Sequence, residues 1–137
     1  RAATGARGGR MALHVAVSRG IPQGKHPTYN VHLRYEGTSE DEAWAVTYRF
    51  NRFRDLREEV CASDPRWRFA AFPKSSRSQS LGVKLNKSAL EARRQGLEEW
   101  VAHLLHHRSK LSEQGQQAVA NAFALMDHPP PAPPSLP

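Results

Sequence analysis

Three runs of alternating apolar and polar residues near the N-terminus constrain the fold most strongly. The first runs from Leu13 to Val17, the second from Tyr29 to Tyr35 and the third from Trp44 to Phe50. A side-chain period of two is typical of strands that bury one face. Because short polar, Gly- or Pro-containing segments connect the runs, we expect a three-stranded antiparallel meander with one covered face.

After the third run, the apolar spacing changes to that of a helix. Phe53, Leu56 and Val60 follow the i, i+3, i+7 pattern of one helix face. Asn51 is a good N-cap for this helix, because its side-chain oxygen accepts a backbone N–H of the first turn. Asp64-Pro65 ends the helix, since a residue that precedes proline disfavours the helical backbone.

A long segment without a single period follows the first predicted helix. Residues 66–87 begin aromatic, turn at Pro73 and become rich in Ser, Lys and Arg, so we interpret them as a long, partly ordered loop. Ser88, with Glu91 three residues later, forms a capping-box pattern. An apolar stripe from Leu90 to Leu105 follows it and predicts a second helix.

Ser112 and an apolar set that reaches Met126 predict a third helix. Strands that precede helices indicate the α+β class, with the meander packed against a helical subdomain of three or more helices. We place one compact domain at residues 11–127. Residues 1–10 are interpreted as a disordered linker or expression-vector remnant, and residues 128–137 as a proline-rich tail that has the spacing of a protein ligand.

The charge balance favours an anionic partner. The formal net charge is +7, and three of the positive charges lie in residues 1–10, which leaves +4 for the rest of the chain. Such a balance suits nucleic acid or an anionic membrane equally well. No apolar run approaches the roughly 20 residues that span a bilayer, and no signal peptide is recognisable.

Few residues suggest chemistry. The single cysteine, Cys61, excludes an internal disulfide and is interpreted as a small buried residue on the inner side of a helix. His103 and His107 have the i, i+4 spacing of a metal pair, but they lack a zinc-protease motif and a nearby cysteine ligand. We therefore expect no metal, no cofactor and no enzymatic activity, since no nucleophile–base pair is evident.

Basic residues gather where the third strand meets the first helix. Arg49 ends the strand just before the predicted N-cap. A helix N-terminus beside a guanidinium is a candidate phosphate-binding site, because both supply hydrogen-bond donors and positive charge. The alternative is a solvated arginine at a strand end. Arg93 and Arg94 flank the apolar stripe of the second helix on opposite sides, and periodicity does not choose between them. Lys74 follows Phe72-Pro73 at the start of the polar loop.

Three segments together resemble the phox homology (PX) domain. They are YRFNRF (48–53) after a strand, FPK (72–74) after the first helix, and EARRQGLEEWVAHLL (91–105) in a later helix. The PX pattern has Arg-Tyr-Ser-Asp-Phe at the junction, a Pro-containing loop with a lysine, and an Arg four residues before a Leu. The resemblance extends roughly from Leu13 to Met126.

The resemblance implies a pocket for a phosphoinositide headgroup. By the family pattern, Arg49 binds the 3-phosphate and Phe50 packs against the inositol ring. Lys74 contacts the 1-phosphate, and the Arg-x-x-x-Leu spacing selects Arg93 for the 4- and 5-hydroxyls. Phe50 replaces the usual Tyr, and Arg52 stands where an acid is usual. Membrane contact is assigned to four residues of the polar loop: Arg77, Leu81, Val83 and Lys84.

The resulting hypothesis is a non-enzymatic module that reads phosphatidylinositol 3-phosphate on endosomal membranes. It implies a cytoplasmic protein bound peripherally to phosphoinositide-bearing membranes, with protein partners through other domains of a larger protein or through the proline-rich tail. The alternative is a PX-like protein-interaction module whose lipid pocket is degenerate, as the changes at Phe50 and Arg52 suggest. Nucleic-acid binding is disfavoured because no such motif is present.

Overall fold

The computed structural model describes residues 12–74 and 86–130 of the chain. Three strands form one antiparallel sheet in the order β1-β2-β3, which confirms the predicted meander. They are β1 (Leu13–Arg19), β2 (Thr28–Tyr35) and β3 (Trp44–Arg49), with a 3-10 turn, η2 (Glu40–Glu42), before β3. Helical elements follow the sheet: α1 (Phe50–Ser63), η3 (Pro65–Phe69), α3 (Lys87–His106), η4 (Arg108–Lys110) and α4 (Glu113–Ala122).

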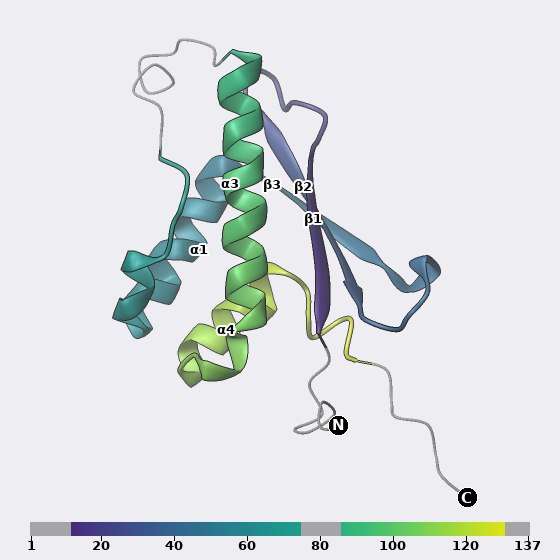
Figure 1. The fold of residues 1–137 in the computed structure, drawn as a ribbon, viewed down its shortest axis with the longest axis vertical. Coiled ribbons are helices and arrows are strands. Elements are labelled where there is room, and N and C mark those ends of the chain that lie inside the picture. The colour runs from purple at the N-terminus through teal and green to yellow at the C-terminus, as the bar shows by residue number, and fades with distance from the viewer. Residues whose placement is uncertain (1–11, 75–85, 131–137) are drawn as a thin grey trace, which may run out of the picture.

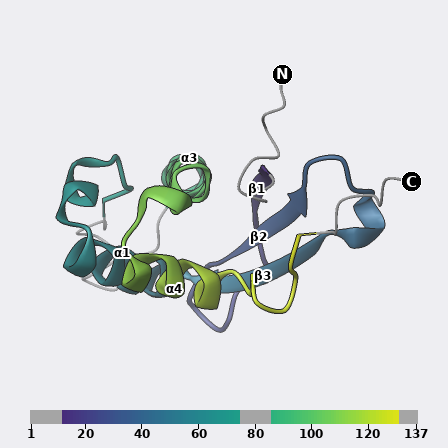
Figure 2. The same ribbon diagram turned by 90° about the horizontal axis from the view of Figure 1, so that it is seen from below.

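The long helix α3 organises the molecule. It runs along β1, with the sheet on one side and α1 on the other (Figure 1). Seen from below, α4 lies beside α1 under the end of α3 (Figure 2). The β1–β2 connection and the N-terminal end of α3 lie at one end of the molecule, while η3 and the C-terminal end of α3 lie at the other (Figure 1). The expected α+β architecture is therefore confirmed.

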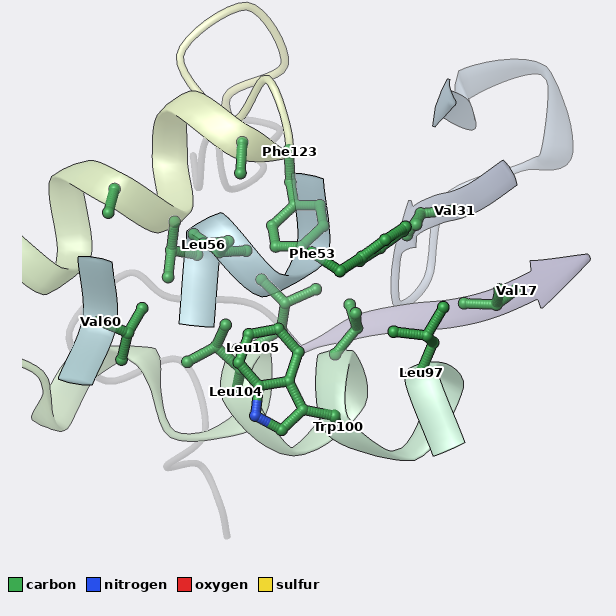
Figure 3. Close-up of a cluster of buried hydrophobic side chains, with 14 of the residues drawn as sticks. Val17, Val31, Phe53, Leu56, Val60, Leu97, Trp100, Leu104, Leu105 and Phe123 are labelled. Carbon is green, nitrogen blue, oxygen red and sulfur yellow. The ribbon is translucent and has the colours of Figure 1, made fainter. Parts of the chain in front are cut away.

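The core fills the space between the sheet, α1 and α3. Every second residue of β2, from Tyr29 to Tyr35, is buried, as the period-two pattern predicts. Burying a large apolar side chain contributes about 1.5–3 kcal/mol, so the core is the main source of stability. Its members from the helical part include Phe53, Leu56 and Val60 of α1, Leu97, Trp100, Leu104 and Leu105 of α3, and Phe123 just after α4 (Figure 3).

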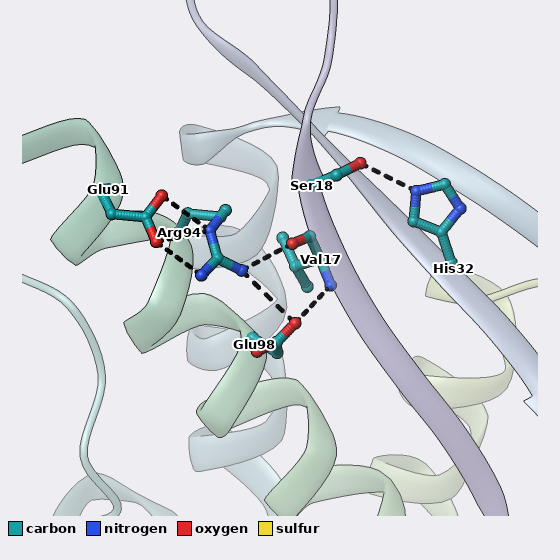
Figure 4. A network of polar contacts seen from close by, with 6 residues as sticks. All are labelled: Val17, Ser18, His32, Glu91, Arg94 and Glu98. Carbon is teal, nitrogen blue, oxygen red and sulfur yellow. Dashed lines mark hydrogen bonds and ion pairs between the residues drawn. The ribbon is translucent and has the colours of Figure 1, made fainter. Parts of the chain in front are cut away.

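The outer edge of β1 is closed by side chains of α3. Glu98 accepts a hydrogen bond of 2.9 Å from the Val17 N–H, and Arg94 donates one of 2.8 Å to the Val17 carbonyl (Figure 4). Arg94 is itself held by Glu91 at 2.7 Å and by Glu98 at 3.4 Å. An edge strand presents unpaired backbone groups, so these two side chains replace a neighbouring strand at this position.

The first helix starts earlier than predicted. Arg49, not Asn51, is the N-cap of α1, and Phe50 is the first helical residue rather than the last residue of the strand. Continuing the strand would leave Phe50 on the same face as Tyr48, whereas the helical turn brings its ring to Arg93 of α3. The predicted end at Asp64 is correct.

The second predicted cap is also wrong by two residues. Asn86 caps α3 by accepting the Ala89 N–H at 2.8 Å, and Ser88 lies inside the first turn. Both are good N-cap residues, so local sequence could not choose between them. The segment interpreted as a loop begins with η3, and its residues 75–85 lie outside the described part of the chain.

The third predicted helix ends at Ala122 and does not reach Met126. Ala124 has a left-handed backbone, and the Leu125 N–H bonds back to the Ala120 carbonyl at 3.0 Å, as in a Schellman motif. The indole of Trp44 donates to the carbonyl of the C-cap residue, Phe123, so a sheet side chain satisfies the end of the helix.

Candidate functional site

The strand-to-helix junction presents a cation, Arg49, that has no partner in the described part of the chain. Arg49 pairs with Thr28 in the β2–β3 register, and its side chain is half-buried. It forms no side-chain hydrogen bond or ion pair with any residue in 12–74 or 86–130. The first turn of α1 contains no acidic residue, and its N-cap makes no side-chain hydrogen bond. The backbone N–H groups of that turn therefore add to the positive potential at Arg49.

Arg93 is buried against Phe50. Its guanidinium carbon lies 4.0 Å from the centroid of the Phe50 ring, within cation–π range. Only 4% of Arg93 and 6% of Phe50 is exposed. The Nη1 atom of Arg93 and the nearby Tyr29 hydroxyl form no hydrogen bond of good geometry among the described residues. The two groups lie close enough for a weak mutual hydrogen bond that shifts the pKa of each. The site therefore contains two buried polar groups that a ligand could satisfy.

The environment shifts the pKa of both groups. Burial lowers the pKa of Arg93; the phenol of Tyr29 acts in the opposite direction, and the charge of Arg54 adds to the lowering. Burial raises the pKa of Tyr29, which the charge of Arg93 and a hydrogen bond with it oppose. Both shifts follow from removing the charged form from water, and an anion bound beside Arg93 would offset that cost for the guanidinium.

The segment that carries Lys74 is fixed by aromatic and proline packing. The Phe72 ring lies 5.7 Å from the Phe50 ring and 5.0 Å from the Trp100 ring, between centroids. Pro73 then packs so closely on Gly96 of α3 that an added Cβ would lie 2.7 Å from its Cγ. Lys74 follows as an exposed residue. The aromatic cluster thus joins the elements that carry Arg49, Phe50, Lys74 and Arg93.

Other arginines of the same elements are already paired. Arg94 points to the β1 edge, as described above, which separates it from Arg93. Arg52 lies 3.4 Å from Glu59 and packs over the Tyr48 ring at 5.3 Å. The residue that departs from the family pattern at an acidic position is therefore a surface ion-pair residue.

One exposed apolar residue was not identified from the sequence. Ile21 of the β1–β2 connection is 88% exposed, although its carbonyl accepts a hydrogen bond of 2.9 Å from the Thr28 hydroxyl. Because Thr28 is the register partner of Arg49, this connection lies at the same end of the sheet as Arg49. An isoleucine inside a Gly- and Pro-rich loop was the available signal. The predicted membrane-contact residues, Arg77, Leu81, Val83 and Lys84, lie outside the described residues.

The remaining candidates have structural roles or none. Cys61 is 2% exposed, as expected for a core residue, and burial raises the pKa of its thiol. The rings of His103 and His107 are 4.7 Å apart, but the described part of the chain holds no group of three residues that could bind a metal. Among the described helices, none is long and apolar enough to cross a membrane.

Comparison with known proteins agrees with this geometry. The family model of the PX domain matches residues 36–117, more than half of the chain. A designed CISK-PX domain solved by X-ray crystallography has the same fold, with a TM-score of 0.52 and 22% sequence identity. That match covers 78% of this chain and 96% of the designed domain. No curated protein matches the chain by sequence. The chain therefore belongs to the PX domain family, a family of phosphoinositide-binding modules that associate peripherally with membranes and not a family of enzymes.

Proposed function

We propose that this PX domain binds phosphatidylinositol 3-phosphate and so targets its parent protein from the cytoplasm to endosomal membranes. In this proposal Arg49, with the N–H groups of the first turn of α1, receives the 3-phosphate. Lys74 receives the 1-phosphate, and Arg93 donates to the 4- and 5-hydroxyls. Phe50 forms the apolar wall against which the inositol ring packs.

One observation carries the proposal: the guanidinium of Arg93 is almost fully buried without a carboxylate partner in the described residues. A buried charge without a partner is costly, so such a group is retained where a ligand completes it. The neighbouring arginines with glutamate partners, Arg52 and Arg94, show that acids are available where neutralisation is needed. Arg49, which has no partner within residues 12–74 and 86–130, extends the same argument to a phosphate.

The exposed Ile21 supports a membrane-facing orientation. It lies at the end of the molecule where the β1–β2 connection and the start of α3 meet (Figure 1). An isoleucine inserted at the interface beside a bound headgroup would add apolar contact to the electrostatic anchor. Since a single headgroup site is a modest anchor, a second membrane contact or a partner domain completes targeting in this proposal.

The alternative, a protein-interaction module with a degenerate lipid pocket, is favoured by one specific contact. The Arg93 guanidinium already covers a face of the Phe50 ring, at 4.0 Å from its centroid. A headgroup that packs against Phe50 must therefore displace this side chain or use the remaining edge of the ring. If neither occurs, the site has the arginines of a phosphoinositide-binding domain but no room for the inositol ring.

Liposome flotation distinguishes these functions. Liposomes of equal total charge would carry phosphatidylinositol 3-phosphate, 4-phosphate or 4,5-bisphosphate, and the native domain would be compared with Arg49→Ala and Arg52→Ala. We expect selective flotation on the 3-phosphate liposomes, its loss in Arg49→Ala, and its retention in Arg52→Ala, the matched loss of one charge from the adjacent helix. Equal flotation of the native domain on all three kinds of liposome would support the degenerate pocket. Equal flotation of Arg49→Ala and Arg52→Ala on the 3-phosphate liposomes would also support it.

A further inference from the structure

A hollow lies towards the opposite end of α3 from the candidate headgroup site. It has a volume of about 700 Å³ and lies between η3 and the C-terminal end of α3. We call it the η3 groove, and its principal lining residues are Arg66, Trp67, Phe69, His103, His107 and Lys110. None of Arg49, Phe50, Lys74 and Arg93 lines it. Its volume is in the range of roughly 300–1,000 Å³ typical of ligand sites.

The η3 groove and the headgroup site are well separated along α3. His103 follows Arg93 by ten residues on α3, and His107, the C-cap residue of that helix, follows it by fourteen. At about 1.5 Å per residue, this places them roughly 15–21 Å from Arg93 along the helix axis. If the end that holds the β1–β2 connection faces a membrane, η3 and the C-terminal end of α3, which line the groove, lie at the opposite end of the molecule (Figure 1). A ligand in the groove is then presented from the aqueous side.

Two aromatic residues give the η3 groove an apolar floor and rim. Trp67 is half-buried, and its ring lies 4.9 Å from that of His103. Phe69 is 91% exposed, which is unusual for a phenylalanine in a folded domain. Exposed aromatic residues at the edge of a groove are typical of anchor points for protein partners.

Apart from Asp64, the ionisable side chains that line the groove are basic. Arg66 and Lys110 are exposed, and His103 and His107 provide further donors. The only acid in the lining, Asp64, is already engaged: it accepts hydrogen bonds from the Ser112 N–H at 2.8 Å and from the Ser112 hydroxyl at 2.9 Å. The groove therefore offers cations that its own carboxylate does not neutralise.

We propose that the η3 groove binds a short acidic peptide segment of a partner protein, one that carries a large apolar side chain among its carboxylates. The apolar side chain packs between Trp67 and Phe69, and the carboxylates face Arg66 and Lys110. Charge complementarity selects this occupant over the chain's own residues 129–137, which contain no charged residue. It also disfavours a second copy, because two basic grooves repel each other.

Nuclear magnetic resonance with the full chain tests the proposal. The probe is a hexapeptide, Glu-Asp-Phe-Glu-Asp-Leu, and its control is the isosteric Gln-Asn-Phe-Gln-Asn-Leu. We expect the acidic peptide to shift the Trp67 indole N–H and the backbone amides of η3 and residues 103–110, and the neutral peptide to shift them at least tenfold less at equal concentration. The double variant Arg66→Glu/Lys110→Glu should weaken binding about tenfold or more.

A matched variant, Lys25→Glu/Lys87→Glu, reverses the same number of charges away from the η3 groove and should bind like the native chain. Equal weakening in both double variants would overturn the proposal, because binding would then follow net charge. Shifts confined to the Arg49 and Arg93 region would overturn it, as would an absence of shifts. Larger shifts of the groove signals with soluble short-chain phosphatidylserine than with the peptide would assign the groove to a lipid instead. Shifts that depend on protein concentration in the absence of peptide would assign it to self-association. Each of these outcomes is independent of whether the domain floats with 3-phosphate liposomes.

Discussion

The guanidinium carbon of Arg93 lies 4.0 Å from the centroid of the Phe50 ring, joining α3 to the start of α1 at the candidate headgroup site. The next residue, Arg94, points away from it to the edge of β1. Two consecutive arginines thus have different partners, one a ring and the other a strand edge with two glutamates. This difference yields a pair of matched predictions.

Arg93→Met should abolish 3-phosphate selectivity at little cost in stability. The variant removes a buried charge that has no carboxylate partner in the described residues, while the methionine keeps contact with the Phe50 ring. Because the lost cation–π contact and the relieved burial oppose each other, we expect the free energy of unfolding to change by less than about 1 kcal/mol. Urea denaturation and liposome flotation measure the two effects. A loss of several kcal/mol would indicate a structural role instead.

Arg94→Met should have the opposite profile. It leaves the Val17 carbonyl without its donor and removes the ion pairs with Glu91 and Glu98. We expect the free energy of unfolding to fall by about 1–3 kcal/mol, with lipid selectivity retained in the folded fraction. The same denaturation and flotation experiments measure both. Selectivity lost in Arg94→Met and retained in Arg93→Met would reverse the assignment of the two arginines.

Tyr29→Phe tests the second buried polar group of the site. The hydroxyl of Tyr29 forms no hydrogen bond of good geometry among the described residues, and its one polar neighbour of note is Arg93, whose pKa it shifts. Its removal therefore costs little in hydrogen bonding. We expect a stability equal to that of the native domain or higher by up to about 1 kcal/mol. Isothermal titration with the soluble headgroup should show weaker binding if the hydroxyl contacts the ligand or positions Arg93. A clear loss of stability would show that the hydroxyl is satisfied in solution.

Gly96→Ala should displace the segment that carries Lys74. A Cβ at Gly96 would lie 2.7 Å from Cγ of Pro73, so the proline must move. Alanine in a helix is otherwise favoured over glycine by about 1 kcal/mol, which limits the net loss of stability. We expect weaker flotation on 3-phosphate liposomes with nearly native stability. Gln95→Ala, on the exposed side of the same turn, is the control and should float like the native domain.

Asp64 should make the free energy of unfolding depend on pH in the acidic range. Burial acts to raise its pKa, but the hydrogen bonds from Ser112 and Ser63 outweigh burial and hold the pKa below its ordinary value of 3.8. A lowered folded-state pKa stabilises the fold above the unfolded pKa, and this contribution disappears as the pH falls through the folded value. Asp64→Asn should therefore reduce stability at neutral pH, with a difference from the native domain that shrinks between about pH 5 and pH 2. Urea denaturation across that range measures it, and a constant difference would contradict the assignment.

Local patterns were sufficient to predict the three strands and the three α-helices, but not the short 3-10 turns. The alternation in Tyr29–Tyr35 predicted the central strand because strand side chains repeat every two residues, and Phe53, Leu56 and Val60 predicted the buried face of α1 in the same way. Both patterns depend on neighbours in the chain. The family resemblance, which the PX match confirms, came from the short segments that join these elements.

Only the tertiary structure decided where the elements end and which polar groups are left without partners. The end of α4 depends on the indole of Trp44, far away in sequence, and the start of α1 on the contact between Phe50 and Arg93. The helical wheel of α3 left Arg93 and Arg94 equivalent, because each borders the apolar stripe. What distinguishes them is that β1 supplies a carbonyl to one, while α1 supplies only an aromatic ring to the other. The chemistry of the site is thus a property of the packed molecule, since burial and the loss of partners arise only when distant segments meet.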